Sequence, residues 1–157
     1  MTEFFDIGDE AGQPTGKIIS RVEAHQKGTL HRTAHVWLVK EKPGGYDILL
    51  QKRSEEKDSF PGMYDTSSAG HILAGDEPLP SALRELKEEL GLEASPEELK
   101  YAGTFRIQYE NEHKKQGRVL IDIALNSFLQ GGAVCQSRMS MTTMISLKTF
   151  RAAEAMT

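Results

Sequence analysis

Apolar residues recur three and four positions apart near the middle of the chain, and this spacing predicts a short α-helix. The helix runs from about Leu79 to Leu90, with Pro80 near its start and Gly91 directly after its end, where helix termini favour these residue types. Its apolar positions are Leu79, Leu83, Leu86 and Leu90. A stripe of this kind predicts a helix that packs one face against a sheet.

Runs of strand-forming residues on both sides of that helix predict the sheet. The predicted strands cover residues 4–7, 32–40, 46–53, 63–71, 101–109 and 119–129, with a short loop at residues 42–45. Ser95 precedes a second, short helix with acidic residues in its first turn. After residue 129 the periodicity weakens, and we expect only a final helix over residues 147–156. These elements predict the α/β class, with helices packed on a mixed sheet.

Another face of the central helix carries three glutamates, Glu85, Glu88 and Glu89. Folding does not require this arrangement, because like charges three and four residues apart destabilise a helix. A hard divalent cation, which prefers oxygen ligands, would reverse that cost, so this face is a candidate metal site. The alternative is a solvated acidic face that Arg84 and Lys87 partly neutralise.

The residues that flank the helix favour the metal site. The fixed positions are Gly70, Asp76, Arg84, Glu85, Glu88, Glu89 and Gly91. Their spacing over residues 70–92 resembles the Nudix box: Gly, five residues, Glu, seven residues, then Arg-Glu-apolar-x-Glu-Glu-x-Gly-apolar. Asp76 is the one departure, since the family usually has Glu there, and Glu77 lies beside it.

The resemblance implies a single Nudix domain over residues 1–157, folded as an α/β/α sandwich with a mixed sheet, and a Mg²⁺-dependent hydrolase, with Mn²⁺ as an alternative ion. It implies that Glu88 and Glu89 bind the metal directly and that Gly70 contributes its backbone carbonyl. Glu85 would bind the metal or orient a ligand, and Arg84 would fix the rotamers of the carboxylates.

Family members take the catalytic base either from the box or from a downstream loop. The chain is nearly free of carboxylates after Glu112, so we favour a glutamate of the box. His113 is the weaker candidate, because a lone histidine is more often a surface residue. The candidate catalytic residues are therefore Glu85, Glu88 and Arg84.

Substrate phosphates need cations besides the metal. Lys52 and Arg53 at the end of a predicted strand, and Lys57 in the following loop, are candidate substrate-binding residues. The alternative is a solvated strand end. Tyr64 and Phe60 are candidates for stacking on a base, although we expect both to pack in the core.

Upstream of the box, the chain resembles the isopentenyl-diphosphate isomerase branch of the Nudix proteins. This resemblance rests on residues 25–32, 49–54 and 60–71 and, with the box, covers roughly residues 4 to 129. It implies a second metal site at His25, His31 and His71, and imidazole is a suitable ligand for a transition metal. The alternative for each histidine is a structural or solvent-facing role.

Two departures separate the chain from the isomerases. The isomerase cysteine that handles the substrate proton is Ala69 here, which has no proton to give, and Cys135 lies too far along the chain to be a simple substitute. The isomerase Glu-x-Glu corresponds to Asp122-Ile123-Ala124, whereas the hydrolase helix, which isomerases typically break, is intact. We therefore expect hydrolysis of a phosphoanhydride in a nucleoside diphosphate or related nucleotide. Isopentenyl-diphosphate isomerase and a non-catalytic nucleotide-binding module remain the alternatives.

Composition narrows the partners further. The 157 residues are 38% hydrophobic and 27% charged, which is ordinary for one soluble domain. The net charge of −4 argues against a nucleic acid polymer or an anionic membrane as partner, and no apolar run has the length of a membrane span or signal peptide. Cys135 is the single cysteine, so we expect a cytoplasmic protein without internal disulfides. A homodimer is a common state for such domains.

Overall fold

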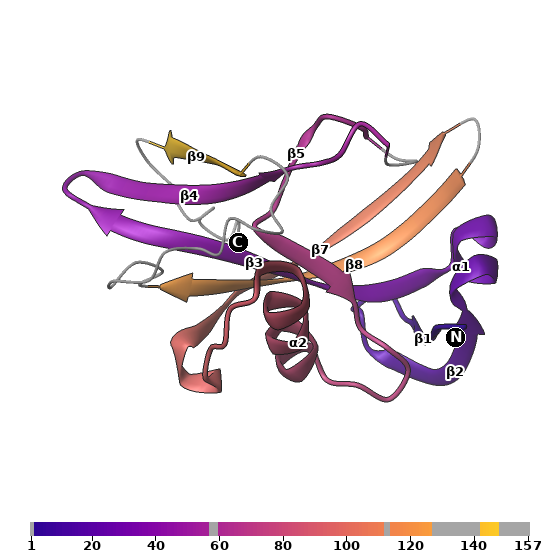
Figure 1. Cartoon of the computed structure of the whole chain (residues 1–157). Helices are drawn as coiled ribbons and strands as arrows, with labels where there is room; N and C mark the ends of the chain where they lie inside the picture. The colour runs from indigo at the N-terminus through magenta and orange to yellow at the C-terminus, as the bar shows by residue number, and fades with distance from the viewer. Residues whose placement is uncertain (1, 57–59, 112–113, 127–141, 148–157) are drawn as a thin grey trace, which may run out of the picture.

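The computed structural model describes residues 2–56, 60–111, 114–126 and 142–147. In these residues one nine-stranded sheet carries helices α1 and α2 (Figure 1). The elements are, in chain order, β1 (Phe4–Gly8), β2 (Pro14–Ser20), α1 (Arg21–Lys27), β3 (Leu30–Lys42), β4 (Gly45–Lys52), β5 (Tyr64–Asp65), β6 (Ser68–His71), α2 (Pro78–Leu90), the 3₁₀ turn η1 (Pro96–Glu98), β7 (Leu99–Asn111), β8 (Lys114–Asn126) and β9 (Thr142–Leu147).

Strand β3 organises the sheet. Strand β8 pairs with it in parallel along one edge, while β1, β6 and β4 pair with it antiparallel. The remaining described pairs, β1–β2, β4–β5, β4–β9 and β7–β8, are antiparallel. The sheet is therefore mixed, as the sequence predicts.

The two helices lie on opposite faces of this sheet. Side chains alternate between faces along a strand. Ala34, Val36 and Leu38 of β3 form the main core with residues of α2. The alternate positions His31 of β3 and His71 of β6 meet His25 of α1 instead. This layering confirms the predicted α/β/α sandwich.

Helix α2 forms almost where the sequence places it. Leu86 and Leu90 are buried, and Gly91 ends the helix in the left-handed region at φ 67°, where its N–H donates to the carbonyl of Lys87 over 3.1 Å. The predicted stripe is wrong at one end, since Leu79 is 36% exposed. Ala82, one turn before Leu86, is fully buried and occupies the core position.

Strands β2 and β9 and helix α1 are not predicted from the sequence. Helix α1 has seven residues, of which only Ala24 is buried, so it carries no apolar stripe. Ser20 caps its first turn by accepting from the N–H of Glu23 over 3.3 Å. The short helix expected after Ser95 is the turn η1, in which Glu98 accepts from the N–H of Ser95 over 2.7 Å.

Other expectations are wrong or lie beyond the described residues. Phe60 and Tyr64 are 52% and 51% exposed, so the expected core packing is wrong. Lys57, His113, Cys135 and the final helix at residues 147–156 lie outside the described residues, apart from Leu147 at the end of β9. No helix among the described residues is long and apolar enough to cross a membrane.

Candidate functional site

A cleft of about 640 Å³ opens beside β6 and α2. It brings together the charged residues that the sequence analysis singled out on α2 and β4. These are Lys52, Arg53, Arg84, Glu85, Glu88 and Glu89. Residues from both faces of the sheet contribute, because His35 and His71 also line this cleft. Lys57 belongs to the residues that the structure does not describe.

Gly70 and Glu85 approach each other closely. A Cβ atom added to Gly70 would lie 1.9 Å from Cδ of Glu85, a distance that no side chain can occupy. A side chain at this position would therefore force the Glu85 carboxyl group to move, and the constraint arises from space and not from a left-handed φ. The contact joins residues that are 15 positions apart, so no local sequence pattern signals it, and the sequence predicts only the role of the Gly70 carbonyl.

Arg84 holds the carboxylate of the next residue, Glu85, in place. One of its guanidinium nitrogens, Nη2, donates to Oε1 of Glu85 over 3.2 Å and to the carbonyl of His71 over 3.0 Å. The other, Nη1, donates to Oδ2 of Asp76 over 3.0 Å. Asp76, the one departure from the box, thus anchors Arg84 and does not line the cleft.

These contacts shift two pKa values. Burial raises the pKa of Glu85, the nearby charges of Glu89 and Glu88 raise it further, and Arg84 opposes the rise. Burial works against the charge of Arg84, but hydrogen bonds and attraction to Glu85 and Asp76 prevail, so its pKa is raised. Without a cation, the Glu85 carboxyl group is therefore harder to ionise than a free glutamate side chain.

Glu89 and Glu88 differ in their surroundings. Oε2 of Glu89 accepts from Oγ of Ser68 over 2.7 Å and from the N–H of Ala69 over 3.2 Å. Both donors belong to β6, so this strand holds the Glu89 side chain in place. Glu88 is exposed and borders the same cleft.

The cationic part of the cleft comes from the end of β4. Nη1 of Arg53 lies 3.0 Å from Oδ2 of Asp65, and the N–H of Arg53 donates to the carbonyl of Met63 over 2.9 Å. Lys52 borders the cleft beside it. Arg21, paired with Glu3 over 2.6 Å, also reaches the cleft; the sequence analysis missed it because α1 was not predicted.

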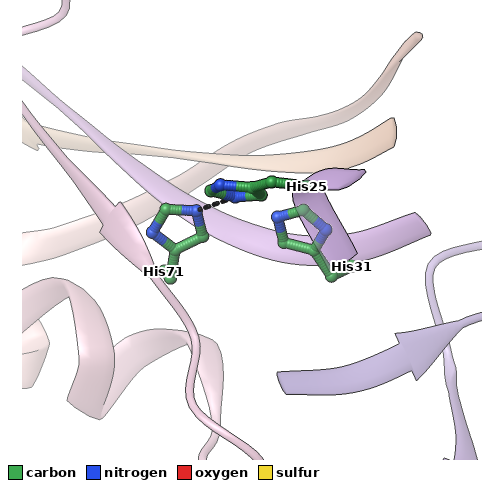
Figure 2. A group of neighbouring side chains, drawn as sticks. All are labelled: His25, His31 and His71. Carbon is green, nitrogen blue, oxygen red and sulfur yellow. Dashed lines mark hydrogen bonds between the residues drawn. The ribbon is translucent and has the colours of Figure 1, made fainter. Parts of the chain in front are cut away.

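The three histidines singled out from the sequence also come together. Figure 2 shows the rings of His25, His31 and His71 gathered in one group, and their candidate ligand atoms lie within 4.8 Å of one another. Nε2 of His25 and Nε2 of His71 are 3.3 Å apart. Phe5 stacks on His31 and His71, with ring centroids 4.9 and 4.6 Å apart, and forms the apolar wall of the group.

The two groups suit different metals. Glu85, Glu88 and Glu89 with the Gly70 carbonyl offer oxygen donors only, the set that a hard divalent ion such as Mg²⁺ prefers. The histidine group offers imidazole nitrogens, which suit zinc, copper, iron or nickel. The alternation of side chains along β6 places these groups on opposite sides of the strand.

Comparison with known proteins identifies the family of the chain. The family model described as NUDIX domain matches residues 29–129 of the chain. The chain is 51% identical over 90 residues to Nudix hydrolase 3 of Arabidopsis thaliana, a match that covers 57% of this chain and 11% of that protein. It is 36% identical over 103 residues to isopentenyl-diphosphate Delta-isomerase of Pectobacterium atrosepticum, covering 66% of this chain and 55% of that protein. The chain thus spans about half, or less, of the length of these relatives.

A solved structure shows the same fold. The protein DR0079 from Deinococcus radiodurans superposes with a TM-score of 0.64 at 18% sequence identity, and the match covers 92% of this chain and 83% of that one. Identity at this level supports the shared fold alone.

Proposed function

The chain belongs to the Nudix family, and on that premise we propose that it is a divalent-metal-dependent hydrolase that cleaves a phosphoanhydride bond. The observation that carries the proposal is the intact carboxylate face of α2, with Glu85 and Glu89 already held by Arg84 and β6. Positioned carboxylates of this kind are what a metal-assisted hydrolysis requires.

The donor set fits Mg²⁺ or Mn²⁺. Glu88 and Glu89 would bind the ion directly, with Glu85 and the carbonyl of Gly70 beside them. The bound ion supplies charge neutralisation on the diphosphate oxygens and a lowered pKa for water. Without it, three carboxylates crowd one helix face, and this crowding contributes to the raised pKa of Glu85.

Side chains of the chain bind the phosphates, orient a carboxylate and provide the catalytic base. Arg53 and Lys52 bind the phosphates from the end of β4, and Asp65 keeps the Arg53 guanidinium at the cleft. Arg84 keeps the Glu85 carboxylate in one rotamer. We assign the base to a box glutamate, with Glu85 first, because burial raises its pKa toward the working pH and so makes it the stronger proton acceptor.

The substrate class follows from the cleft and from the resemblance together. The cleft combines carboxylates for a metal with cations for phosphates, which suits a diphosphate group. The resemblance to hydrolases built on an isomerase scaffold favours a nucleoside diphosphate derivative as the compound that carries it.

Isomerisation of isopentenyl diphosphate is the second candidate, favoured by the histidine group and by the relative from Pectobacterium atrosepticum. Ala69 weighs against it, because the cleft wall has a methyl group where the isomerases have a thiol. We propose that His25, His31 and His71 form a second metal site whichever reaction the chain performs. A Nudix module that binds nucleotides without turnover is the third candidate.

One experiment separates the three. The protein is incubated with Mg²⁺ and a panel of nucleoside di- and triphosphates, dinucleotides, nucleotide sugars and isopentenyl diphosphate. Release of phosphate or nucleoside monophosphate supports the hydrolase, and formation of dimethylallyl diphosphate without phosphate release supports the isomerase. Binding without turnover supports the module. E89Q, which removes one charged oxygen donor, is expected to lower turnover at least about 10²-fold, and unchanged turnover would remove Glu89 from the ligand set.

We also propose a cellular location and an oligomeric state for the protein. We propose a cytoplasmic location, since the single cysteine at position 135 allows no internal disulfide. We also propose a homodimer, which sedimentation of the purified protein would test.

A further inference from the structure

Ser68 is a buried residue with an uncommon partner. Its side chain is fully buried, at the first position of β6, and its hydroxyl donates to Oε2 of Glu89 over 2.7 Å. The N–H of the next residue, Ala69, donates to the same oxygen over 3.2 Å. Two donors from one strand therefore hold one oxygen of a carboxylate on a different element.

The two carboxylate oxygens of Glu89 have different surroundings. Oε2 lies against β6 and is occupied by both donors, so Oε1 is the oxygen that remains to face the cleft. A ligand carboxylate that is hydrogen-bonded through its second oxygen is fixed in direction before the metal arrives. The rotational freedom of a glutamate side chain is then lost on folding and not on metal binding.

The neighbouring Ser67 provides a direct contrast. It is also fully buried, but its hydroxyl donates to the carbonyl of Leu49 over 2.6 Å and accepts from the N–H of Leu38 over 2.8 Å. Both partners are backbone groups of the sheet. Ser67 thus has a purely structural use for its hydroxyl, whereas the partner of Ser68 is a side chain that borders the cleft.

We propose that Ser68 is a positioning residue that aims Oε1 of Glu89 at the divalent metal of the carboxylate face. The inference rests on the proposed function, because it takes Glu89 as a metal ligand. It goes beyond that proposal by naming a residue outside the box and the oxygen that each partner uses. Loss of the hydroxyl leaves the bond from the N–H of Ala69, so the expected effect is partial, about a tenfold loss of metal affinity.

The experiment measures Mn²⁺ binding by electron paramagnetic resonance, so that the readout does not depend on turnover. Four proteins are titrated: wild type, E89Q, S68A and S67A. The Mn²⁺ that E89Q loses defines the site, which separates it from any ion on the histidines. S68A is expected to bind this ion about tenfold more weakly, whereas S67A keeps the wild-type affinity although its melting temperature falls.

Each other result overturns the inference. Wild-type affinity in S68A would show that the hydroxyl does not position the ligand, and an equal loss in S67A would show a general effect of disturbing the strand. If E89Q binds Mn²⁺ as wild type does, the inference fails together with the assignment of Glu89. Failure of the proposed function is recognised separately, by the absence of turnover on the substrate panel in the same wild-type preparation.

Discussion

The contact between Gly70 and Glu85 provides the sharpest test of the carboxylate site. In G70A, the new methyl group would lie 1.9 Å from Cδ of Glu85, so the carboxyl group must retreat by about 1.5 Å to reach an ordinary contact distance of 3.4 Å. It can retreat, because it is the far end of a flexible side chain. Retreat pulls Oε1 away from Arg84, to which it is hydrogen-bonded over 3.2 Å.

The magnitude follows from two opposing terms. A hydrogen bond to a charged group contributes about 1.5–3 kcal/mol to stability. Alanine in place of glycine restores about 0.4–1 kcal/mol by restricting the unfolded chain, since the φ of Gly70 is one that alanine can adopt. The net loss is therefore about 0.5–2.6 kcal/mol. For a domain of this size, Tm falls by about 2–4 °C for each kcal/mol lost. Displacing a catalytic group by about 1 Å costs on the order of 10²-fold in rate, so kcat/KM falls by that factor.

The assay combines thermal unfolding with turnover of whichever substrate the panel identifies. Gly8 provides the matched control, because a Cβ there would meet its nearest atom at 3.7 Å, an ordinary contact. G8A is expected to keep both Tm and kcat/KM close to wild type. If G70A behaved like G8A in both measurements, the steric account of this position would be wrong.

A double-mutant cycle isolates the cause. In E85A the carboxyl group is gone, so the added methyl group at position 70 has nothing to displace. G70A introduced into E85A is therefore expected to be stabilising by about 0.4–1 kcal/mol, and the two substitutions should be coupled by about 1.5–3 kcal/mol, the contribution of the displaced hydrogen bond. An equal cost of G70A in both backgrounds would mean that the destabilisation arises elsewhere.

Two further outcomes are expected, one for the carboxylate site and one for the three-histidine group. Because the folded pKa of Glu85 is raised, the metal-free protein gains stability from this group below pH 4.5 and loses it as the pH rises through the folded pKa. The stability of E85Q relative to wild type, measured by thermal unfolding in a chelator, should therefore be greater at pH 8 than at pH 4.5, and a pH-independent difference would contradict this reasoning. Co²⁺ added to the protein should give a visible absorption band. H25Q should lose this band and H35Q should keep it, because His25 belongs to the three-histidine group and His35 does not. A band that survives in H25Q would exclude that group as its origin.

The sequence predicts those parts of the site that lie within one helix. Glu85, Glu88 and Glu89 share a face because the α-helix repeats every 3.6 residues, and Gly91 ends the helix because glycine adopts a left-handed φ easily. The strands β3 and β4 are also found, since their apolar residues are concentrated enough to be visible locally. Periodicity alone is sufficient for these features.

The parts that the sequence does not predict depend on pairing between distant residues. Ser68 meets Glu89 across 21 positions, and nothing in the local sequence around either residue signals that contact. Helix α1 escapes detection because it has only one buried residue, so its sequence has no amphipathic pattern to read. Leu79 is predicted in the core but lies exposed, and Ala82 is the first residue of α2 that belongs to the main apolar core.

Strand β6 explains how one scaffold can carry features of two reactions. Ser68 and Gly70 face α2, where they contact Glu89 and Glu85, while Ala69 and His71 face the side of α1 and the other histidines. Because consecutive residues of a strand point to opposite faces, a substitution at position 69 changes the histidine side without altering the contacts of the carboxylates. The thiol of the isomerases can therefore be exchanged for a methyl group while the carboxylate face stays intact. The missing thiol proton weakens the isomerase candidate, and the independence of the two faces is the physical reason why the same residue leaves the hydrolase candidate untouched.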